Sequence, residues 1–145
     1  MRGTFLGFDF GTKYLGIAVG QTITQTARPL VTLVVHKGVP HWETLDKIIQ
    51  EWQPQAFIVG LAIQPDGSHS ATSKKALKFG KSLQSHYNIA VHYIEERLTS
   101  VAAKERIKEN VAMTAIEKDL DAVAAAIILE SWLHGLAQEI GDATV

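Results

Sequence analysis

One carboxylate lies inside an apolar segment of the sequence: Asp9 is the only charged residue of Thr4–Phe10, and a glycine-bounded run, 11–16, follows it. Burying a carboxylate in an apolar strand costs free energy unless another group pairs with it. Gly11 and Gly16 suit a tight turn that lets a ligand approach the backbone. A metal ion or a phosphate would explain the pattern, and so would backbone donors that satisfy Asp9 at a strand end.

Two adjacent carboxylates, Glu95 and Glu96, directly follow the apolar stretch 90–94. Neighbouring side chains of a strand point to opposite faces, so only one of these glutamates can face the same pocket as Asp9. The residues alone leave open which one it is. The competing interpretation is a solvated strand end that leads into the N-cap of a helix.

A third acidic group, Asp119 and Asp121, precedes the longest uninterrupted apolar run of the chain, the eight residues 122–129. Acids at a helix N-terminus are ordinary, because they cap free amides and interact favourably with the helix dipole. Asp121 nevertheless leads straight into apolar sequence, which indicates that it enters the core region.

These three acidic positions indicate one shared chemistry, because strand ends and a helix start can converge at one edge of a sheet. Three clustered carboxylates repel one another unless a cation holds them. Oxygen ligands favour Mg²⁺ or Mn²⁺. Two such ions clamping a phosphodiester would activate water and stabilise the leaving oxygen. The pattern therefore predicts metal-dependent hydrolysis of a phosphodiester.

The elements that must position these acids follow from the hydrophobic periodicity. The first three strands read as an antiparallel meander, and crossover helices make the later strands parallel. The fold class is therefore α/β: a five-strand mixed sheet with helices on both faces and a site at the carboxyl ends of the parallel strands. We predict strands at Thr4–Phe10, 15–20, 29–35, 56–61 and 90–94, and helices at Trp42–Trp52, 70–86, 101–109 and from Asp119 or Asp121 to about Glu139, with 112–118 ambiguous.

Composition limits the remaining functions. The 145 residues include 14 Lys and Arg, 15 Asp and Glu and no Cys, for a formal net charge of −1. The length favours one domain, 1–140, with a short tail at 141–145. Without Cys, disulfides and Cys-based zinc or iron–sulfur sites are excluded. No apolar run approaches the roughly 20 residues of a membrane helix, so we expect no membrane partner. The charge excludes a strongly basic nucleic-acid binder and leaves room for a local basic face.

Basic residues near the acids are candidates for phosphate contacts. The predicted helix at 70–86 carries Lys74, Lys75, Lys78 and Lys81 with no intervening acid, and the first, third and fourth of these share a face. They form either a phosphate-binding stripe or a solvated helix face. Substrate contacts are also expected of two residues beside the acids, Lys13 and Arg97. Arg97 could equally pair with one of the two adjacent glutamates.

The order and spacing of these motifs resemble the RNase H-like superfamily and, within it, the small bacterial YqgF family. The resemblance spans nearly the whole chain. Members of that family are described as nucleases of pre-16S rRNA and were formerly described as Holliday junction resolvases. The matching pieces are FDFGTKYLGIAVGQ, TARPL, IVGLAIQPDGS, EERLTS and LDAVAAAIILESWL.

This resemblance implies a site. The family's acids correspond here to Asp9, Glu96 and Asp121, and Glu96 is chosen because it precedes Arg-Leu-Thr. The resemblance implies that Asp9 bridges two Mg²⁺ or Mn²⁺ ions and that the other two acids complete the sites. Asp119 is the nearest candidate for a fourth acid. Three positions depart from the family's usual residues: Tyr14 often aligns with Arg, Ala62 with Pro and Glu95 with Asp.

The resemblance also implies a function. Hydrolysis would leave a 5′-phosphate and a 3′-hydroxyl, and the substrate would be structured RNA at the 5′ end of pre-16S rRNA, in the cytoplasm, presented by a ribosomal particle. The protein would be a monomer or a weak homodimer. The alternative is a Holliday junction resolvase, which needs a two-fold dimer to cut opposing strands.

Two other classes fit the sequence less well. ATPases that open with Asp-x-Gly-Thr need two such domains and well over twice this length. A non-catalytic nucleic-acid-binding module gains nothing from three carboxylates beside phosphate.

Overall fold

The structure is a computed structural model that describes residues 3–97 and 120–143, with the backbone alone at 96–97 and 136–143. The predicted helix at 101–109, the ambiguous segment 112–118 and Asp119 lie outside the described residues.

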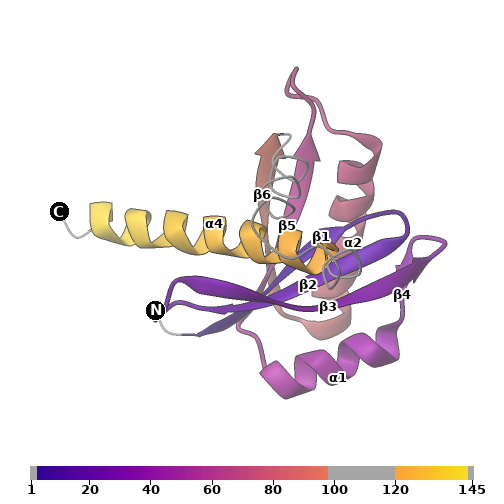
Figure 1. Cartoon of the computed structure of the whole chain (residues 1–145), viewed down its shortest axis with the longest axis horizontal. Coiled ribbons are helices and arrows are strands. Elements are labelled where there is room, and N and C mark those ends of the chain that lie inside the picture. Colours follow the sequence, from indigo (N-terminus) through magenta and orange to yellow (C-terminus); the bar gives the residue numbers. More distant parts are fainter. Residues whose placement is uncertain (1–2, 98–119, 144–145) are drawn as a thin grey trace.

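Figure 1 shows the arrangement of the elements. Among the described helices, none has the length and apolar character needed to cross a membrane. The strands are β1 (Thr4–Phe10), β2 (Tyr14–Gln21), β3 (Thr26–His36), β4 (Val39–Pro40), β5 (Ala56–Ile63) and β6 (Ala90–Arg97), and the helices are α1 (Trp42–Trp52), α2 (Ala71–Tyr87) and α4 (Leu120–Ala143).

The strands form one mixed sheet in the order β4-β3-β2-β1-β5-β6. The β1–β2, β2–β3 and β3–β4 pairs are antiparallel, whereas β1–β5 and β5–β6 are parallel. The predicted meander followed by parallel strands is confirmed. The sheet has six strands, one more than predicted.

The additional strand is β4, which is only two residues long and contains Pro40, so its sequence gives no strand pattern. A two-residue turn creates it. Lys37 and Gly38 both have positive φ, 52° and 78°, and His36 pairs with Val39 across them. Positive φ at both central residues is the property of the tight turns that match the twist of a hairpin.

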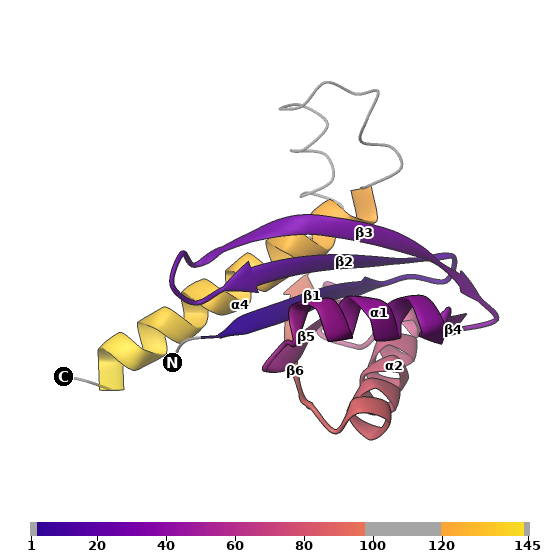
Figure 2. The same ribbon diagram turned by 90° about the horizontal axis from the view of Figure 1, so that it is seen from below.

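The two faces of the sheet are covered differently (Figure 2). On β1, Leu6 and Phe8 belong to a core that also contains residues of α1 and α2, such as Leu45 and Leu83. Phe5 belongs instead to a second core with residues of α4. Because side chains alternate along a strand, the odd-numbered residues of β1 face α4 and the even-numbered ones face α1 and α2.

Helix α4 crosses β1 and β2 at very short range, because glycines line the strands beneath it. A Cβ placed on Gly7 would lie 2.8 Å from Leu129 Cβ and 2.9 Å from the carbonyl oxygen of Ala125. A Cβ on Gly20 would lie 2.9 Å from Leu129 Cδ2. Ala125 itself is fully buried. Small residues on both sides therefore let the helix backbone rest directly on the sheet.

We predict that Gly7→Ala destabilises the protein, whereas the same substitution at Gly135, in an open stretch of α4, does not. The new Cβ at position 7 meets helix backbone, and such overpacking costs about 1–3 kcal/mol. At Gly135 nothing lies within 4 Å of the new Cβ, so Ala gains up to about 1 kcal/mol of helix propensity. Urea unfolding of both variants measures the difference. Equal stabilities would contradict the close packing of α4.

Candidate active site

Asp9 is the penultimate residue of β1, and its strand partner is Gly16 of β2. Its neighbours Phe8 and Phe10 are both buried in the core on the α1 and α2 side. The alternation of the strand therefore turns Asp9 to the face that α4 covers, where it is half-buried. The sequence prediction of a carboxylate at the edge of the central strand is compatible with this position.

Gly16 brings a second carboxylate to the same place. A Cβ on Gly16 would lie 1.9 Å from the carbonyl oxygen of Asp121 and 2.7 Å from the amide nitrogen of Ala122. The first turn of α4 therefore rests on the backbone of β2, directly beside the strand partner of Asp9. Asp9 and Asp121, far apart in the sequence, are brought to one end of the sheet by this contact.

The third predicted acid, Glu96, lies in β6, which continues three residues beyond the predicted end at Ile94. The backbone of Glu96 pairs with Ala62 of β5. Since Phe8 pairs with Val59, Glu96 lies two strands from β1 and two residues beyond the level of Asp9. Strand spacings of about 4.8 Å and a rise of about 3.3 Å per residue give a Cα separation of about 12 Å.

Glu95 lies on the opposite face from Asp9. Tyr93, two residues earlier in β6, donates a hydrogen bond to the carbonyl oxygen of Leu77 in α2 at 3.4 Å. Burial of Tyr93 raises the pKa of its hydroxyl. By the two-residue period, Glu95 shares the α2 face with Tyr93, and its side chain is exposed. The structure thus separates Glu95 from the face that Asp9 and α4 share.

The donors at this end of the sheet suit a hard divalent cation. Asp9 and Asp121 supply carboxylate oxygens, and the ligand types preferred by softer metals, Cys and His, are absent from the described positions around them. Among the described residues, the hydroxyl oxygen of Thr32, the strand partner of Gly16, is buried and has no hydrogen-bond partner. Among the side chains that the structure describes, no group of three His, Cys, Asp or Glu is close enough to bind a metal. Glu96 is described by its backbone alone and is therefore not among these side chains.

The predicted phosphate contacts lie in three places: the β1–β2 turn, the end of β6 and helix α2. Lys13 is exposed in the β1–β2 turn, which is fixed against β3 because the amide of Val35 donates to the carbonyl oxygen of Lys13 at 2.8 Å. The backbone of Arg97 pairs with Ile63 at the end of β6. The α2 lysines, Lys74, Lys75, Lys78 and Lys81, are all exposed.

Two of the four lysines of α2 line a pocket. Lys75 and Lys78 line a pocket together with Thr12 of the β1–β2 turn and Lys37 of the β3–β4 turn, whereas Lys74 and Lys81 are not among the residues that line it. Sequence reasoning grouped Lys78 with Lys74 and Lys81 and did not consider Lys37. The Lys37-Gly38 pair was the available signal, because a glycine after a strand marks a turn.

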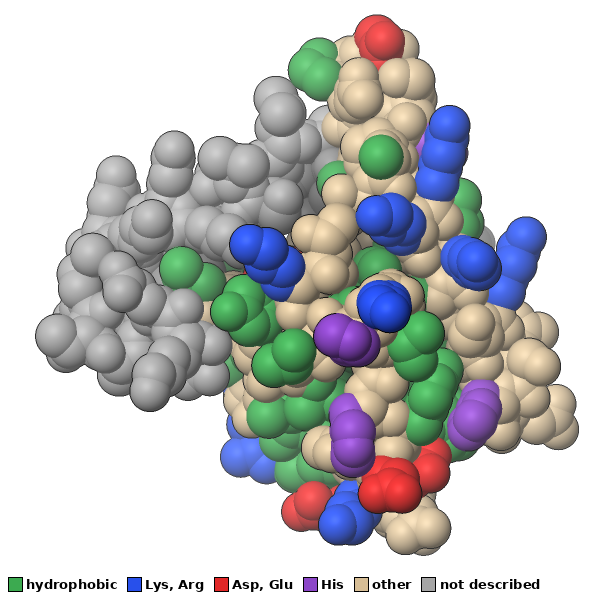
Figure 3. Space-filling view, turned by 90° about the vertical axis from the view of Figure 1, so that its right-hand side faces the viewer, with side chains coloured by type: hydrophobic (Ala, Val, Ile, Leu, Met, Phe, Trp, Pro, Cys, Tyr) green, Lys and Arg blue, Asp and Glu red, His purple; other side chains and the backbone are tan. Residues whose placement is uncertain are grey.

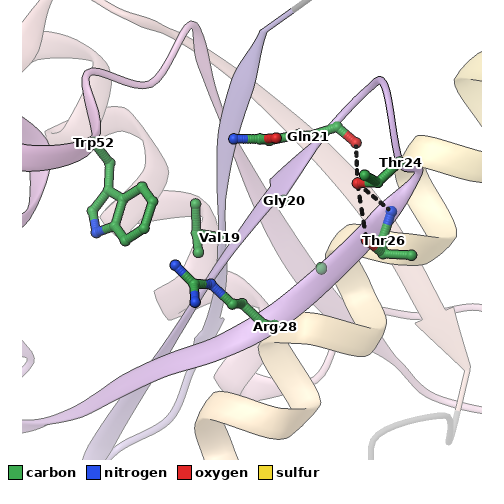
Figure 4. A pocket seen from close by; sticks show the side chains of 8 residues that line it. Val19, Gly20, Gln21, Thr24, Thr26, Arg28 and Trp52 are labelled. Carbon is green, nitrogen blue, oxygen red and sulfur yellow. Dashed lines mark hydrogen bonds between the residues drawn. The ribbon is translucent and has the colours of Figure 1, made fainter.

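Another pocket, of about 270 Å³, lies at the opposite end of β2 (Figure 4). The guanidinium of Arg28 lies 5.1 Å from the ring centroid of Trp52, which is a cation–π contact. Two threonines also line this pocket, and the hydroxyl of Thr26 donates a hydrogen bond to the hydroxyl oxygen of Thr24 at 2.9 Å. None of the predicted acids lines this pocket, so it is separate from the candidate active site.

The architecture matches solved structures of resolvases. The Thermus thermophilus RuvC structure in complex with a Holliday junction substrate aligns with a TM-score of 0.53 at 19% identity, covering 92% of this chain and 95% of that one. A fowlpox virus resolvase in complex with Holliday junction DNA aligns with a TM-score of 0.53 at 12% identity, covering 92% and 98%. At these identities the likeness establishes the fold, which is RNase H-like, as predicted.

Sequence comparison is more specific. A family model described as Holliday junction resolvase, RuvX, matches residues 3–135. A Pseudomonas aeruginosa protein with the name "Putative pre-16S rRNA nuclease" is 46% identical over 129 residues, covering 88% of this chain and 90% of the relative. A relative of the same name from Actinobacillus pleuropneumoniae is 44% identical over 135 residues, covering 92% and 98%. The chain belongs to the RuvX family, also called YqgF, which confirms the resemblance seen in the sequence.

We predict that Gly16→Ala loosens the first turn of α4, because its Cβ would overlap the carbonyl oxygen of Asp121. Gly60→Ala is the matched control: its Cβ would lie 2.5 Å from Ile128 Cδ1, the tip of a flexible side chain of the same helix. Amide hydrogen exchange at residues 122–126 should accelerate in the first variant and stay near the wild-type rate in the second. Similar exchange in both variants would contradict a backbone contact at Gly16.

Proposed function

We propose that this protein is a metal-dependent nuclease that hydrolyses phosphodiester bonds in RNA and processes the 5′ end of pre-16S rRNA. The single observation that carries the proposal is the contact at Gly16, which sets Asp121 beside the strand partner of Asp9. This contact brings two acidic residues to one end of the sheet, and carboxylate oxygens are the ligands that hard divalent cations prefer. The name shared by the relatives at 43–46% identity supports the RNA substrate.

In this proposal Asp9, Glu96 and Asp121 are the catalytic residues and the metal ligands. The two-residue period of β6 assigns position 96 to the face of His92 and Ile94, which is the face of α4 and Asp9, and this supports Glu96 over Glu95. Asp119 remains the candidate for a fourth acid.

The ions that fit these oxygen donors are Mg²⁺ and Mn²⁺. When bound, two such ions supply Lewis-acid stabilisation of the charge that develops on the phosphate and leaving oxygen. The chain's own residues do the remaining work. Asp9 would hold the ions together with Glu96 and Asp121, and the contact of α4 with Gly16 positions the backbone of Asp121 beside β2. Lys13, in the turn that follows Asp9, and Arg97, at the end of β6, donate to non-bridging phosphate oxygens.

A second candidate function is resolution of Holliday junctions. It is favoured by the description of the family model and by the resolvase structures that share the fold. A resolvase must present two active sites to opposing strands and therefore needs a two-fold dimer. We place the RNA substrate first because the more similar relatives bear the nuclease name, whereas the resolvase structures are at most 19% identical in the two alignments given above.

The proposal also includes a setting for the reaction. A chain with a net charge of −1 attracts bare nucleic acid weakly. We therefore propose that a ribosomal particle in the cytoplasm presents the RNA, and that the protein acts as a monomer or weak homodimer. Binding to free RNA should then fall steeply with salt. Tight, salt-insensitive binding to arbitrary duplexes would contradict this part of the proposal.

We predict that Asp9→Asn, Glu96→Gln and Asp121→Asn each abolish cleavage of an end-labelled RNA that carries the 16S precursor 5′ leader. Loss of a direct metal ligand should exceed the roughly 100-fold upper range seen for outer-shell partners. Glu95→Gln is the control, because Glu95 lies on the other face of β6, and it should retain activity within a few-fold. The assay is run with Mg²⁺, Mn²⁺ or EDTA.

A four-way DNA junction is offered in parallel to separate the two candidate functions. RNA cleavage that needs a divalent cation and Asp9 supports the rRNA nuclease. Symmetric nicking of the junction, with the RNA left intact, assigns the protein to the resolvases. RNA cleavage that persists in Asp9→Asn or in EDTA contradicts the proposed site.

A further inference from the structure

A pocket of about 500 Å³ opens on the face of the sheet opposite α4, and the charged residues that line it are all basic. Its cationic lining comes from two elements: Lys37 from the β3–β4 turn, and Lys75 and Lys78 from α2. Thr12 and Ser82 add hydroxyl donors, and no carboxylate is among the described residues that line it. Figure 3 shows a group of lysine and arginine side chains in the upper and middle part of this view, while other basic side chains lie beside acidic ones at its lower edge.

The charge around this pocket is unusual for a chain with a net charge of −1. Helix α2 carries four lysines and no acid, whereas α1, which lies on the same face, carries three acids and one lysine. The positive charge is therefore concentrated on one side of this face. Concentrated charge of one sign steers an oppositely charged ligand to that place even when the whole molecule is near neutral.

The pocket floor is apolar and aromatic. Phe79 is 4% exposed, and its ring stacks on Phe10 with centroids 4.9 Å apart. The ring of Trp42 stacks on His86, with a centroid distance of 4.4 Å and an interplanar angle of 11°. The ring of Trp42 also lies 6.4 Å from that of Phe79, so the three aromatic residues that line the pocket contact one another. Such a floor suits a ribose ring or the edge of a base, beneath the ammonium groups that suit a phosphate.

The pocket and the candidate active site share one edge of the sheet. Asp9 faces α4, while the next residue, Phe10, lines the pocket on the other face. The β1–β2 turn begins directly after them, and its Thr12 also lines the pocket. A strand of nucleic acid that crosses this turn would therefore contact both places.

We propose that this pocket binds the phosphate and sugar of one nucleotide of the RNA strand, at a distance from the bond that is cut, after the strand has passed over the β1–β2 turn. This inference rests on the proposed nuclease function and identifies a substrate-binding site remote from the carboxylates. A three-lysine cluster with hydroxyl donors holds the phosphate. The aromatic floor contacts the sugar, which favours a nucleotide over an acidic peptide.

Binding is tested without cleavage, by fluorescence anisotropy of a labelled single-stranded RNA in EDTA over a range of salt concentrations. Each lost phosphate contact should reduce the log–log salt slope by about 0.7 and weaken binding about fivefold at 0.1 M salt. We expect this result for Lys37→Gln, and a threefold larger change in slope when Lys75→Gln and Lys78→Gln are added. Lys47→Gln, which removes the same charge from the exposed face of α1, should bind as wild type.

A local readout places the RNA in the pocket. The chain has three tryptophans, and of these Trp42 lines the pocket. With 5-fluorotryptophan incorporated, RNA should shift the ¹⁹F resonance of Trp42 and leave that of Trp132 unchanged. The affinities of RNAs that carry a 5′-phosphate or a 5′-hydroxyl are also compared. A pocket for a terminal phosphate would bind the first RNA more tightly, whereas a pocket for a backbone phosphodiester, as proposed, should bind both equally.

An unchanged salt slope of RNA binding in Lys37→Gln and in the triple variant would overturn the inference. That result is also the one expected if the pocket binds an acidic protein instead of RNA. Equal losses in Lys37→Gln and Lys47→Gln would overturn the inference too, since these would reflect net charge alone. The binding result is independent of the carboxylates, so failure of the cleavage assay and failure of this site are distinguishable.

Discussion

The close contact between α4 and the strands beneath it is the constraint on which the candidate site depends. Gly7, Gly16 and Gly20 remove the side chains that would hold the helix away from the sheet, and each would place a Cβ within 3 Å of α4 atoms. Interiors at this density resist even the addition of a methyl group. The position of Asp121 relative to Asp9 is therefore set by backbone against backbone, without reliance on flexible side chains.

Much of the fold can be predicted from the sequence. The helix Trp42–Trp52 is found with the predicted bounds, and the alternation of strands and helices fixes the mixed sheet. Two features were not predicted, the strand β4 and the full length of β6, because both depend on backbone geometry that single residues do not encode. The strand β4 arises from a turn in which Lys37 has positive φ, and β6 extends through polar residues because β5 provides a partner as far as Ile63. Periodicity detects apolar faces, so it misses pairing that continues beyond them.

For the candidate site too, the sequence predicts the residues, and the folded sheet is needed to show which face each one lies on. The sequence identified Asp9 and Asp121 as carboxylates in apolar surroundings, and family resemblance selected Glu96. Which faces these residues share depends on strand register, and the register becomes visible only in the folded sheet. Glu95 illustrates the point: as an isolated residue it is as good a candidate as Glu96, and its place on the α2 side of β6 is a property of the fold.

The route of the chain has a consequence for the timing of folding. Asp9 stands near the start of the polypeptide, and its counterpart Asp121 stands at the first turn of the element made after all the strands. During synthesis, a nascent chain that has reached β6 can already pair its strands, yet the glycine-lined surface on β1 and β2 stays open to water. Closing so long a loop carries an entropic cost that only the docking of α4 repays. Asp121 therefore reaches its place beside β2 late in folding.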